Sequence, residues 1–309
     1  MNIMPQESIP SPVPFRCGYV ALVGAPNVGK STLMNELLGH KLSIVTAKPQ
    51  TTRQRVLGIY NDPSAQIIFL DTPGLIAPQY LLHRRMLSQA ASAVADADIV
   101  IVMTEAGAGT SLSPEVEDLI GSLKSFKPIF LLINKADAIY KPELLPIMAA
   151  FVGRGQFAEV IPVSALKRQN LDDLLATIIR TLPEQPAFYP NDILSEQPER
   201  FFVAEFIREA VFEQFREEVP YSTAVEIRDF RERDAGAAYI AADIIVERDS
   251  QKGILIGRNG ASLKAVGEVS RRQIEAFISR RVFLDLHVKV RDGWRQDERA
   301  LNRLGYAEG

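Results

Sequence analysis

The distribution of apolar residues divides the chain into two parts. Between residues 18 and 182, short apolar runs rich in β-branched residues alternate with segments of helical periodicity. The runs span residues 20–23, 67–70, 99–103, 129–133 and 160–163. Buried strands connected by helices form a parallel sheet, so this alternation predicts an α/β fold. Runs at 55–60 and 66–70, separated by a turn sequence, predict one hairpin within the sheet.

A second pattern follows residue 198. It predicts a helix at 200–215, strands at 224–230 and 239–247, a glycine turn at 257–260, a helix at about 261–280 and a strand at 282–290. A helical segment also precedes the glycine turn, so the predicted order is α-β-β-α-α-β. This order predicts a smaller α+β domain, with the aromatic and aliphatic stripe of its first helix in the core.

Proline-rich segments mark the expected boundaries. Residues 183–198 contain four prolines and little periodicity, which is typical of a linker. The first 15 residues also contain four prolines and no apolar segment flanked by basic residues, so we expect residues 1–17 to be a disordered tail and not a signal peptide. The expected domains are therefore residues 18–182 and 199–309.

Composition narrows the class of protein. A length of 309 residues suits two domains, and 47% hydrophobic residues can supply a core to each. The single cysteine, Cys17, excludes an internal disulfide and is expected to be buried, and no stretch has transmembrane length. We therefore expect a cytoplasmic protein. From residue 191 onward, 19 Lys and Arg stand against 22 Asp and Glu, which argues against strong non-specific affinity for RNA.

A glycine-rich loop at residues 24–31 is the clearest chemical signal. Its sequence GAPNVGKS lies between an apolar run and a helical segment and matches GxxxxGKS. In such a loop, backbone amides face phosphate oxygens, Lys30 adds a positive charge, and the Ser31 hydroxyl can ligate a phosphate-bound Mg²⁺. The expected nucleotide contacts here are Gly24, Ala25, Pro26, Asn27, Val28, Gly29, Lys30, Ser31 and Thr32.

A second candidate segment directly follows the run at 67–70. It comprises Asp71, Thr72, Pro73, Gly74 and Leu75. A carboxylate at the end of a strand can reach the Mg²⁺ through water, and the Gly74 amide can contact a γ-phosphate. The alternative interpretation is an ordinary turn built from Asp, Pro and Gly.

Two further segments indicate the base. Asn134, Lys135, Ala136 and Asp137 follow the run at 129–133 as an NKxD motif. The Asp137 carboxylate can accept hydrogen bonds from N1–H and the exocyclic amine of guanine, a donor pair that adenine lacks, so the predicted nucleotide is GTP. After the run at 160–163, Ser164 and Ala165 are expected to close over guanine with a backbone amide.

These motifs, in this order, resemble those of the translation-factor-related GTPases. The resemblance implies a threonine that closes on Mg²⁺ when the γ-phosphate is present, for which Thr52 is favoured and Thr51 is the alternative. It also assigns catalytic roles to Lys30, Thr52 and Gly74. The implied Mg²⁺ ligands are Ser31, Thr52 and Asp71.

The catalytic details stay open. Leu75 occupies the place where Ras-like enzymes have a glutamine that orients water, so either hydrolysis is slow and requires a partner, or a cation assists it. In GTPases that this chain resembles, an asparagine at the position of Asn27 helps to hold K⁺; the alternative is that Asn27 satisfies the loop backbone. Arg53 and Arg55 are either an internal arginine finger or solvated side chains.

The glycine turn of the second domain suggests a nucleic-acid contact. Gly257, Arg258, Asn259 and Gly260 form a GxxG, which alone could be a simple turn. Within the order α-β-β-α-α-β it resembles a type II KH domain, whose GxxG clamps four single-stranded nucleotides beside an apolar groove. Lys264 is expected to add a phosphate contact. Trp294 allows two interpretations, packing of the last helix or stacking on a base.

The combination of both domains resembles the bacterial Era family of GTPases. The sequences KPQTTR at 48–53, DTPG at 71–74 and GILIGRNG at 253–260 carry this resemblance. It implies a GTPase that assists assembly of the small ribosomal subunit, binds the 3′ region of 16S rRNA and associates peripherally with the inner membrane face. From the sequence itself we expect Mg²⁺ as the cofactor and a monomer, because no heptad or exposed apolar stripe argues for an oligomer. Two alternatives remain: an RNA chaperone with incidental GTP turnover, and a KH-like unit that docks protein.

Overall fold

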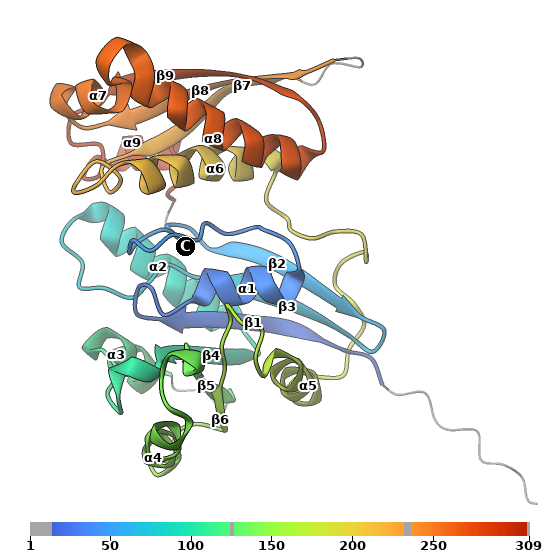
Figure 1. Cartoon of the computed structure of the whole chain (residues 1–309). Helices are drawn as coiled ribbons and strands as arrows, with labels where there is room; N and C mark the ends of the chain where they lie inside the picture. Colours follow the sequence, from blue (N-terminus) through green and yellow to red (C-terminus); the bar gives the residue numbers. More distant parts are fainter. Residues whose placement is uncertain (1–13, 124–126, 232–235, 308–309) are drawn as a thin grey trace, which may run out of the picture.

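The protein consists of two stacked domains (Figure 1). The computed structural model describes residues 14–123, 127–231 and 236–307, so most of the expected N-terminal tail lies outside the described residues. The first strand, β1 (Arg16–Gly24), begins two residues before the expected start of the first domain. Arg16 and Cys17, expected to belong to the tail, are therefore part of this strand, and the Cys17 side chain is buried.

The first domain contains a six-stranded sheet with the strand order β2-β3-β1-β4-β5-β6. Only β2 runs antiparallel to its neighbour, β3, which confirms the predicted hairpin in a mostly parallel sheet. The elements after β1 are α1 (Lys30–Leu38), β2 (Val56–Asp62), β3 (Ala65–Asp71), α2 (Leu81–Asp96), β4 (Ile99–Glu105), α3 (Pro114–Ser122), β5 (Ile129–Asn134), α4 (Lys141–Val152), β6 (Glu159–Pro162) and α5 (Leu171–Thr181).

Helices cover both faces of this sheet. Along β1, Val20 and Leu22 join the core beneath α1 and α5, whereas Ala21 and Val23 join the core beneath α2, α3 and α4. This is why the strands read as continuous apolar runs: successive side chains point to opposite faces and both faces are buried. The carboxyl ends of the parallel strands meet at one edge of the sheet, where each predicted motif begins.

The second domain has the predicted order of elements and one further short helix. They are α6 (Glu199–Gln214), β7 (Ala224–Arg231), β8 (Ala238–Val246), α7 (Asp249–Ile256), α8 (Ala261–Ile278), β9 (Val282–Val290) and α9 (Glu298–Arg303). Strand β8 pairs antiparallel with β7 and parallel with β9. Phe202 and Phe206 of α6 pack against Phe277, so the aromatic stripe is core, as predicted. Trp294 is fully buried and packs with Leu301 of α9.

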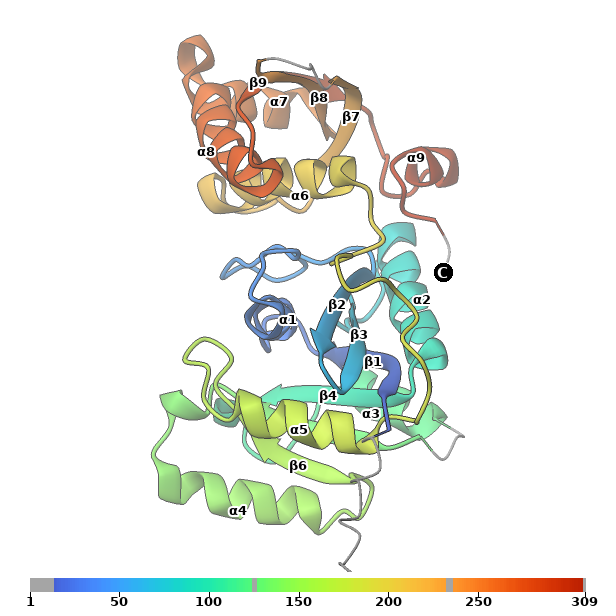
Figure 2. The ribbon, with the colours of Figure 1, turned by 90° about the vertical axis from the view of Figure 1, so that its right-hand side faces the viewer.

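The linker is hydrogen-bonded to the first domain along its length. It runs along β2 and β3 before it reaches α6 (Figure 2). The Gln66 side chain, fully buried, accepts a hydrogen bond from the Tyr189 amide at 3.0 Å, and Leu194 accepts one from the Ile59 amide at 2.9 Å. Near its end, the Gln197 side chain donates to a carbonyl oxygen just before β2 at 3.2 Å. The first domain therefore holds the linker along most of its length.

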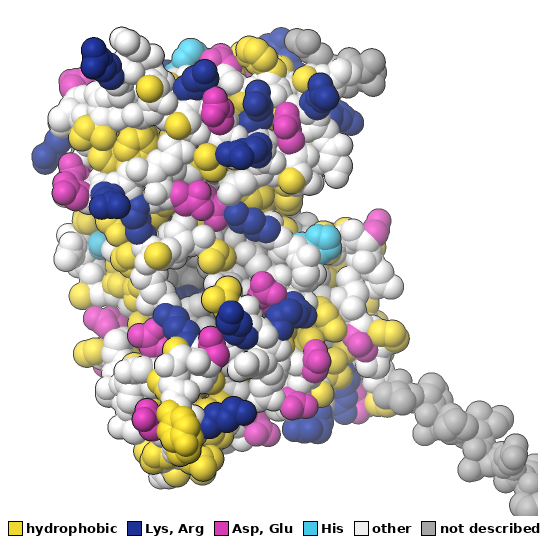
Figure 3. Space-filling view, in the orientation of Figure 1, with side chains coloured by type: hydrophobic (Ala, Val, Ile, Leu, Met, Phe, Trp, Pro, Cys, Tyr) yellow, Lys and Arg dark blue, Asp and Glu magenta, His cyan; other side chains and the backbone are white. Residues whose placement is uncertain are grey.

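Helix α4 has an apolar outer face, seen at the lower end of the molecule (Figure 3). The exposed fractions of Tyr140, Leu145 and Val152 are 72%, 68% and 62%. Over the residues that the structure describes, no helix combines the length and apolar character needed to cross a membrane.

Candidate functional site

A cavity of about 600 Å³ opens at the carboxyl edge of the first domain's sheet. Most of the predicted nucleotide contacts line it. These are Pro26, Asn27, Gly29, Lys30, Ser31, Thr32, Thr52, Thr72, Gly74, Asn134, Lys135, Asp137, Ser164 and Ala165. The loop between α1 and β2 also supplies residues 44–47 and 50–51 to the wall; of these, only Thr51 was a candidate, as the alternative to Thr52. Seven other expected contacts do not line the cavity: Gly24, Ala25, Val28, Asp71, Pro73, Leu75 and Ala136. Val28 and Leu75 are core residues, and Asp71 is fully buried directly behind Ser31.

Three oxygen-bearing side chains meet at the bottom of this cavity. The Ser31 hydroxyl lies 2.7 Å from Asp71 Oδ2 and 2.9 Å from the Thr52 hydroxyl, which itself donates to Asp71 Oδ2 at 3.3 Å. The structure thus brings Thr52, and not the side chain of Thr51, to the other two. Asp71 Oδ1 is buried and has no hydrogen-bond partner among the described residues. Hard oxygen donors with one uncompensated carboxylate oxygen fit Mg²⁺.

The ionisation of two groups reflects their burial. Lys30 is 6% exposed, and its ammonium donates to the carbonyl oxygens of Gly24 and Ala25 at 3.1 and 3.0 Å. Burial lowers the pKa of Lys30 to about 8, against the opposing effect of Asp71. Burial likewise raises the pKa of Asp71, although Lys30 and the neighbouring hydroxyls counteract this. The Lys30 ammonium and the Asp71 carboxylate are therefore both desolvated. Lys30 could neutralise the charge of a phosphate, and Asp71 that of a cation.

Asn134 joins the loops around the cavity. Its side-chain amide donates to the Val28 carbonyl oxygen at 2.7 Å and accepts from the Ala165 amide at 3.0 Å. Gly29 permits this close approach, because a Cβ there would lie 2.2 Å from Asn134 Nδ2, and its φ is +99°. The Ala165 amide, expected to face guanine, is thus engaged with Asn134, and the Ser164 amide donates to Gln169.

The other NKxD side chains lie toward the rim of the cavity. Lys135 forms an ion pair with Glu105 at 2.5 Å and has a φ of +58°. Asp137 is exposed on the cavity wall, with its carboxylate available to a ligand. This placement is the one that base recognition by a carboxylate requires.

The residues around the expected γ-phosphate position are held tightly. Gly74 packs against Pro26, and the Leu75 amide donates to the Gly24 carbonyl oxygen at 3.1 Å. Leu75 is 4% exposed, so its side chain belongs to the core and not to the reaction site. The Asn27 side-chain amide donates to the Ala47 carbonyl oxygen at 3.1 Å and thereby holds the loop that covers the cavity.

Neither candidate arginine finger lies in the cavity, and neither side chain is simply solvated. Arg53 is 3% exposed and donates to the carbonyl oxygens of Thr223 and Tyr221 in the second domain at 2.6 and 2.9 Å. Arg55 forms an ion pair with Asp96 at 2.5 Å. Both interpretations of Arg53 were wrong because packing of the second domain, which has no local sequence signal, decides its environment.

A second cavity of about 390 Å³ lies beside the GxxG turn. Gly260 and Lys264, both predicted contacts, line it, whereas Arg258 and Asn259 are exposed at the turn. Gly257 has a φ of +69°, and a Cβ there would lie 2.2 Å from the Ser262 hydroxyl oxygen. The turn therefore requires glycine, and an extended backbone can approach it closely.

Strand β9 supplies the apolar wall of this cavity. Phe283, Leu284 and Leu286 line it opposite α8, and Phe283 is 63% exposed. An apolar groove is expected beside the GxxG of a type II KH domain, but these three residues were not among the predicted contacts. A large aromatic side chain at the exposed face of a predicted strand is the signal that could have identified Phe283.

Comparisons with known proteins agree with this geometry. Residues 19–135 match the family model described as 50S ribosome-binding GTPase, and residues 218–295 match a KH domain model. GTPase Era of Geobacter metallireducens is 47% identical over 95% of this chain and 98% of its own length. The chain belongs to the Era family of GTPases. The chloroplastic GTPase ERA1 of Zea mays is 44% identical over 94% of this chain and 70% of its own length.

Two solved Era structures are similar along the whole fold. One is Era in complex with MgGDPNP and nucleotides 1506–1542 of 16S ribosomal RNA; the other is an Aquifex aeolicus Era variant bound to GDP·AlF4⁻. Each has a TM-score of 0.91 and 40% identity and covers 95% of this chain. The match includes 99% of the first structure's chain and 100% of the second's. The Era fold, a GTPase domain followed by a KH domain, is thus the fold of this chain.

Proposed function

We propose that the chain binds GTP with Mg²⁺, hydrolyses it, and binds the 3′ region of 16S rRNA through its KH domain during assembly of the small ribosomal subunit. The convergence of Ser31, Thr52 and Asp71 beside the cavity carries the first part. The relative solved with MgGDPNP and 16S rRNA nucleotides supports both parts. We propose that the first domain ends at residue 182, that residues 183–198 form the linker, and that the second domain begins at residue 199.

The residues of the chain divide the work of hydrolysis. Lys30 holds phosphate oxygens, and the Gly74 amide donates to the γ-phosphate. Ser31, Thr52 and Asp71 hold the cation, which neutralises charge on the phosphates when bound. Asp137 selects guanine. Leu75 provides no group that orients water, so we expect slow hydrolysis without a partner.

Potassium activation is a second element of the proposal. The Asn27 amide nitrogen donates to the Ala47 carbonyl oxygen, which leaves the side-chain oxygen of Asn27 as the atom that could ligate a monovalent cation beside the phosphates. Exchange of KCl for NaCl at equal ionic strength should then lower kcat in the parent protein. An Asn27→Ala variant should show equal rates in both salts; a parent that is insensitive to the salt would contradict this part.

The KH domain offers a narrow contact and not a broad basic surface. Acidic side chains are interspersed among the Lys and Arg side chains of the visible face (Figure 3). Its cavity combines apolar walls with Lys264, which suits a few unstacked bases and their phosphates. A cytoplasmic location, with peripheral contact to the inner membrane face, completes the proposal.

The deciding experiment is a titration with single-stranded RNA copied from the 3′ end of 16S rRNA. The full chain is titrated once with GDP and once with a non-hydrolysable GTP analogue. Tighter binding with the analogue supports a nucleotide-controlled switch. Equal binding favours the alternative of an RNA chaperone with incidental GTP turnover, and no binding in either state would refute the RNA assignment.

A further inference from the structure

The second domain holds the loop between α1 and β2 from outside. Residues 39–55, all described, form no helix or strand. The Lys48 ammonium donates to two carbonyl oxygens at the end of α6. Glu209 of α6, fully buried, pairs with Lys41 at 2.5 Å and accepts from the Val45 amide at 3.0 Å. Since the loop lacks regular structure of its own, these contacts fix its conformation together with the hydrogen bonds of Asn35 and Asn27 in the first domain.

Three consecutive residues of this loop connect the two domains with the nucleotide site. Arg208 of α6 donates to the Thr51 carbonyl oxygen. Arg53 donates to the Thr223 carbonyl oxygen at 2.6 Å. Between them, the Thr52 hydroxyl faces the Ser31 and Asp71 cluster described above. The outer two residues are thus held by the second domain, and the middle one belongs to the nucleotide site.

Arg208 is built to be rigid. Its side chain is 1% exposed, its Nε donates to Glu205 at 2.8 Å, and its guanidinium lies 5.4 Å from the centre of the Phe212 ring. A buried guanidinium that is fixed by a carboxylate and an aromatic face has one orientation available. The Thr51 carbonyl oxygen therefore meets a donor whose position is set by the second domain alone.

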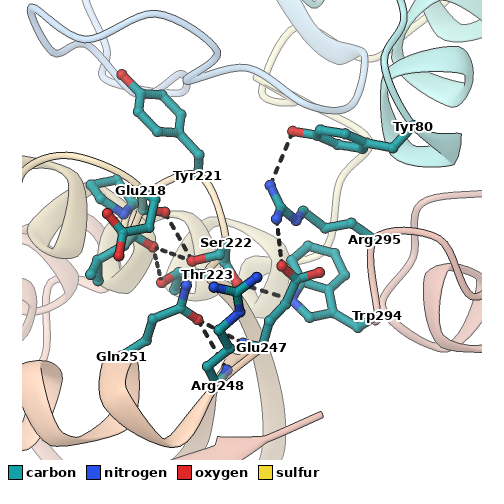
Figure 4. A network of polar contacts seen from close by, with 12 residues as sticks. Tyr80, Glu218, Tyr221, Ser222, Thr223, Glu247, Arg248, Gln251, Trp294 and Arg295 are labelled. Carbon is teal, nitrogen blue, oxygen red and sulfur yellow. Dashed lines mark hydrogen bonds and ion pairs between the residues drawn. The ribbon is translucent and has the colours of Figure 1, made fainter. Parts of the chain in front are cut away.

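The segment that accepts the hydrogen bonds of Arg53 is equally well fixed (Figure 4). The Ser222 hydroxyl donates to the Glu218 carbonyl oxygen at 2.9 Å, and Trp294 Nε1 donates to the Ser222 carbonyl oxygen at 2.9 Å. The Thr223 hydroxyl donates to a carbonyl oxygen one turn earlier at 2.7 Å. Both anchors of the Thr52 segment consequently stand on rigid parts of the second domain.

We propose that Arg208 is a positioning residue for GTP hydrolysis, acting from the second domain through the Thr51 carbonyl oxygen to fix Thr52 beside Ser31 and Asp71. This inference rests on the proposed function. It makes the KH domain a structural part of the nucleotide site. Any departure of Thr52 from the cavity breaks a bond to α6, so the nucleotide state and the docking of the second domain are coupled.

The test uses Arg208→Met combined with Glu205→Gln in the full chain, so that no carboxylate loses its partner. Loss of a charge-assisted hydrogen bond should lower kcat about tenfold. The Mg²⁺ concentration needed for half-maximal hydrolysis should rise, whereas GDP affinity should stay within about twofold, because Thr52 acts only with the γ-phosphate. The matched control is Arg303→Met, which removes an exposed ion pair with Glu226 and should change neither quantity.

Combination with Thr52→Ala separates this inference from the assignment of the site. If Arg208 acts through Thr52, the Arg208 replacement should lower kcat no further once Thr52 is alanine. A Thr52→Ala variant with parental kcat would instead refute the role of Thr52. An impaired Thr52→Ala variant together with parental kcat in the Arg208 variant, or with additive effects, would overturn the inference. Arg208→Met alone serves if the double replacement does not fold, as judged by thermal unfolding.

Discussion

Asn134 offers the most direct check of how the nucleotide site is assembled. Its side chain is 3% exposed and joins the phosphate-binding loop to the loop after β6 through Val28 and Ala165. Replacement by alanine removes one donor and one acceptor at once. The Val28 carbonyl oxygen and the Ala165 amide are then left buried without their partners.

The cost follows from these two bonds. An unsatisfied buried donor or acceptor costs about 1–3 kcal/mol, so the loss of both bonds in Asn134→Ala should lower the free energy of unfolding of the first domain by about 2–6 kcal/mol. For a domain of this size, at about 2–4 °C per kcal/mol, that corresponds to a fall of about 4–24 °C in Tm. Affinity for GDP and for GTP should fall together by at least about tenfold, because both nucleotides use the loops that Asn134 holds.

Thermal unfolding by circular dichroism and titration with fluorescent GDP and GTP analogues measure both effects. Asn134→Asp keeps the acceptor for Ala165 but places a buried carboxylate oxygen against the Val28 carbonyl oxygen, so its Tm should lie at or below that of Asn134→Ala. Gln89→Ala, which removes a partly exposed side-chain amide that donates to the Ala307 carbonyl oxygen at 3.2 Å, is the control. An Asn134→Ala protein with the Tm and affinities of the parent would refute the reasoning.

Three further predictions concern single groups. The pKa of Lys30 is about 8 in the nucleotide-free protein, so its charge is present below that pH and lost above it. GDP affinity should therefore fall about tenfold from pH 7 to pH 9. A Lys30→Met variant that kept this pH dependence would contradict the assignment. Asp137→Ala should abolish the preference for GTP over ITP, which lacks the exocyclic amine, in competition binding; a retained preference would place base recognition elsewhere. Gly257→Asp introduces a Cβ 2.2 Å from the Ser262 hydroxyl oxygen at a φ of +69° and should weaken RNA binding more than tenfold. Gly253→Ala, which has open space around its Cβ position, is the control and should leave RNA binding unchanged. Equal RNA affinities of the two variants would argue against the GxxG contact.

Local sequence was sufficient for the elements and for most of the nucleotide site. Each motif follows a strand whose apolar run is visible in the sequence, and parallel strands bring their carboxyl ends together, so Ser31, Asp71 and Asn134 had to lie near one another. The hairpin before β3 was predictable because two alternating runs flank a short turn. The sequence narrowed the site threonine to Thr51 or Thr52, and the side-chain direction in the structure decides for Thr52.

The contacts between the domains could not be predicted in this way. Arg53 follows the site threonine in a loop without periodicity, and Arg208 lies on a helix whose sequence indicates only an apolar stripe. Which partners they meet depends on how two separately folded units dock, and no pattern within either unit encodes that. The structure also engages the Ala165 amide with Asn134, a contact between loops 31 residues apart.

The anchored linker determines how the second domain can move. Hydrogen bonds hold it to the first domain as far as Gln197, and α6 begins at Glu199, which leaves Pro198 as the pivot. A free flexible chain of the same length would let its ends wander over about 20–24 Å. A short tether keeps the detached domain at an effective local concentration in the millimolar range. Docking is therefore an intramolecular equilibrium, independent of protein concentration, in which the loss of one buried contact, such as that of Arg53 or Arg208, can shift the balance.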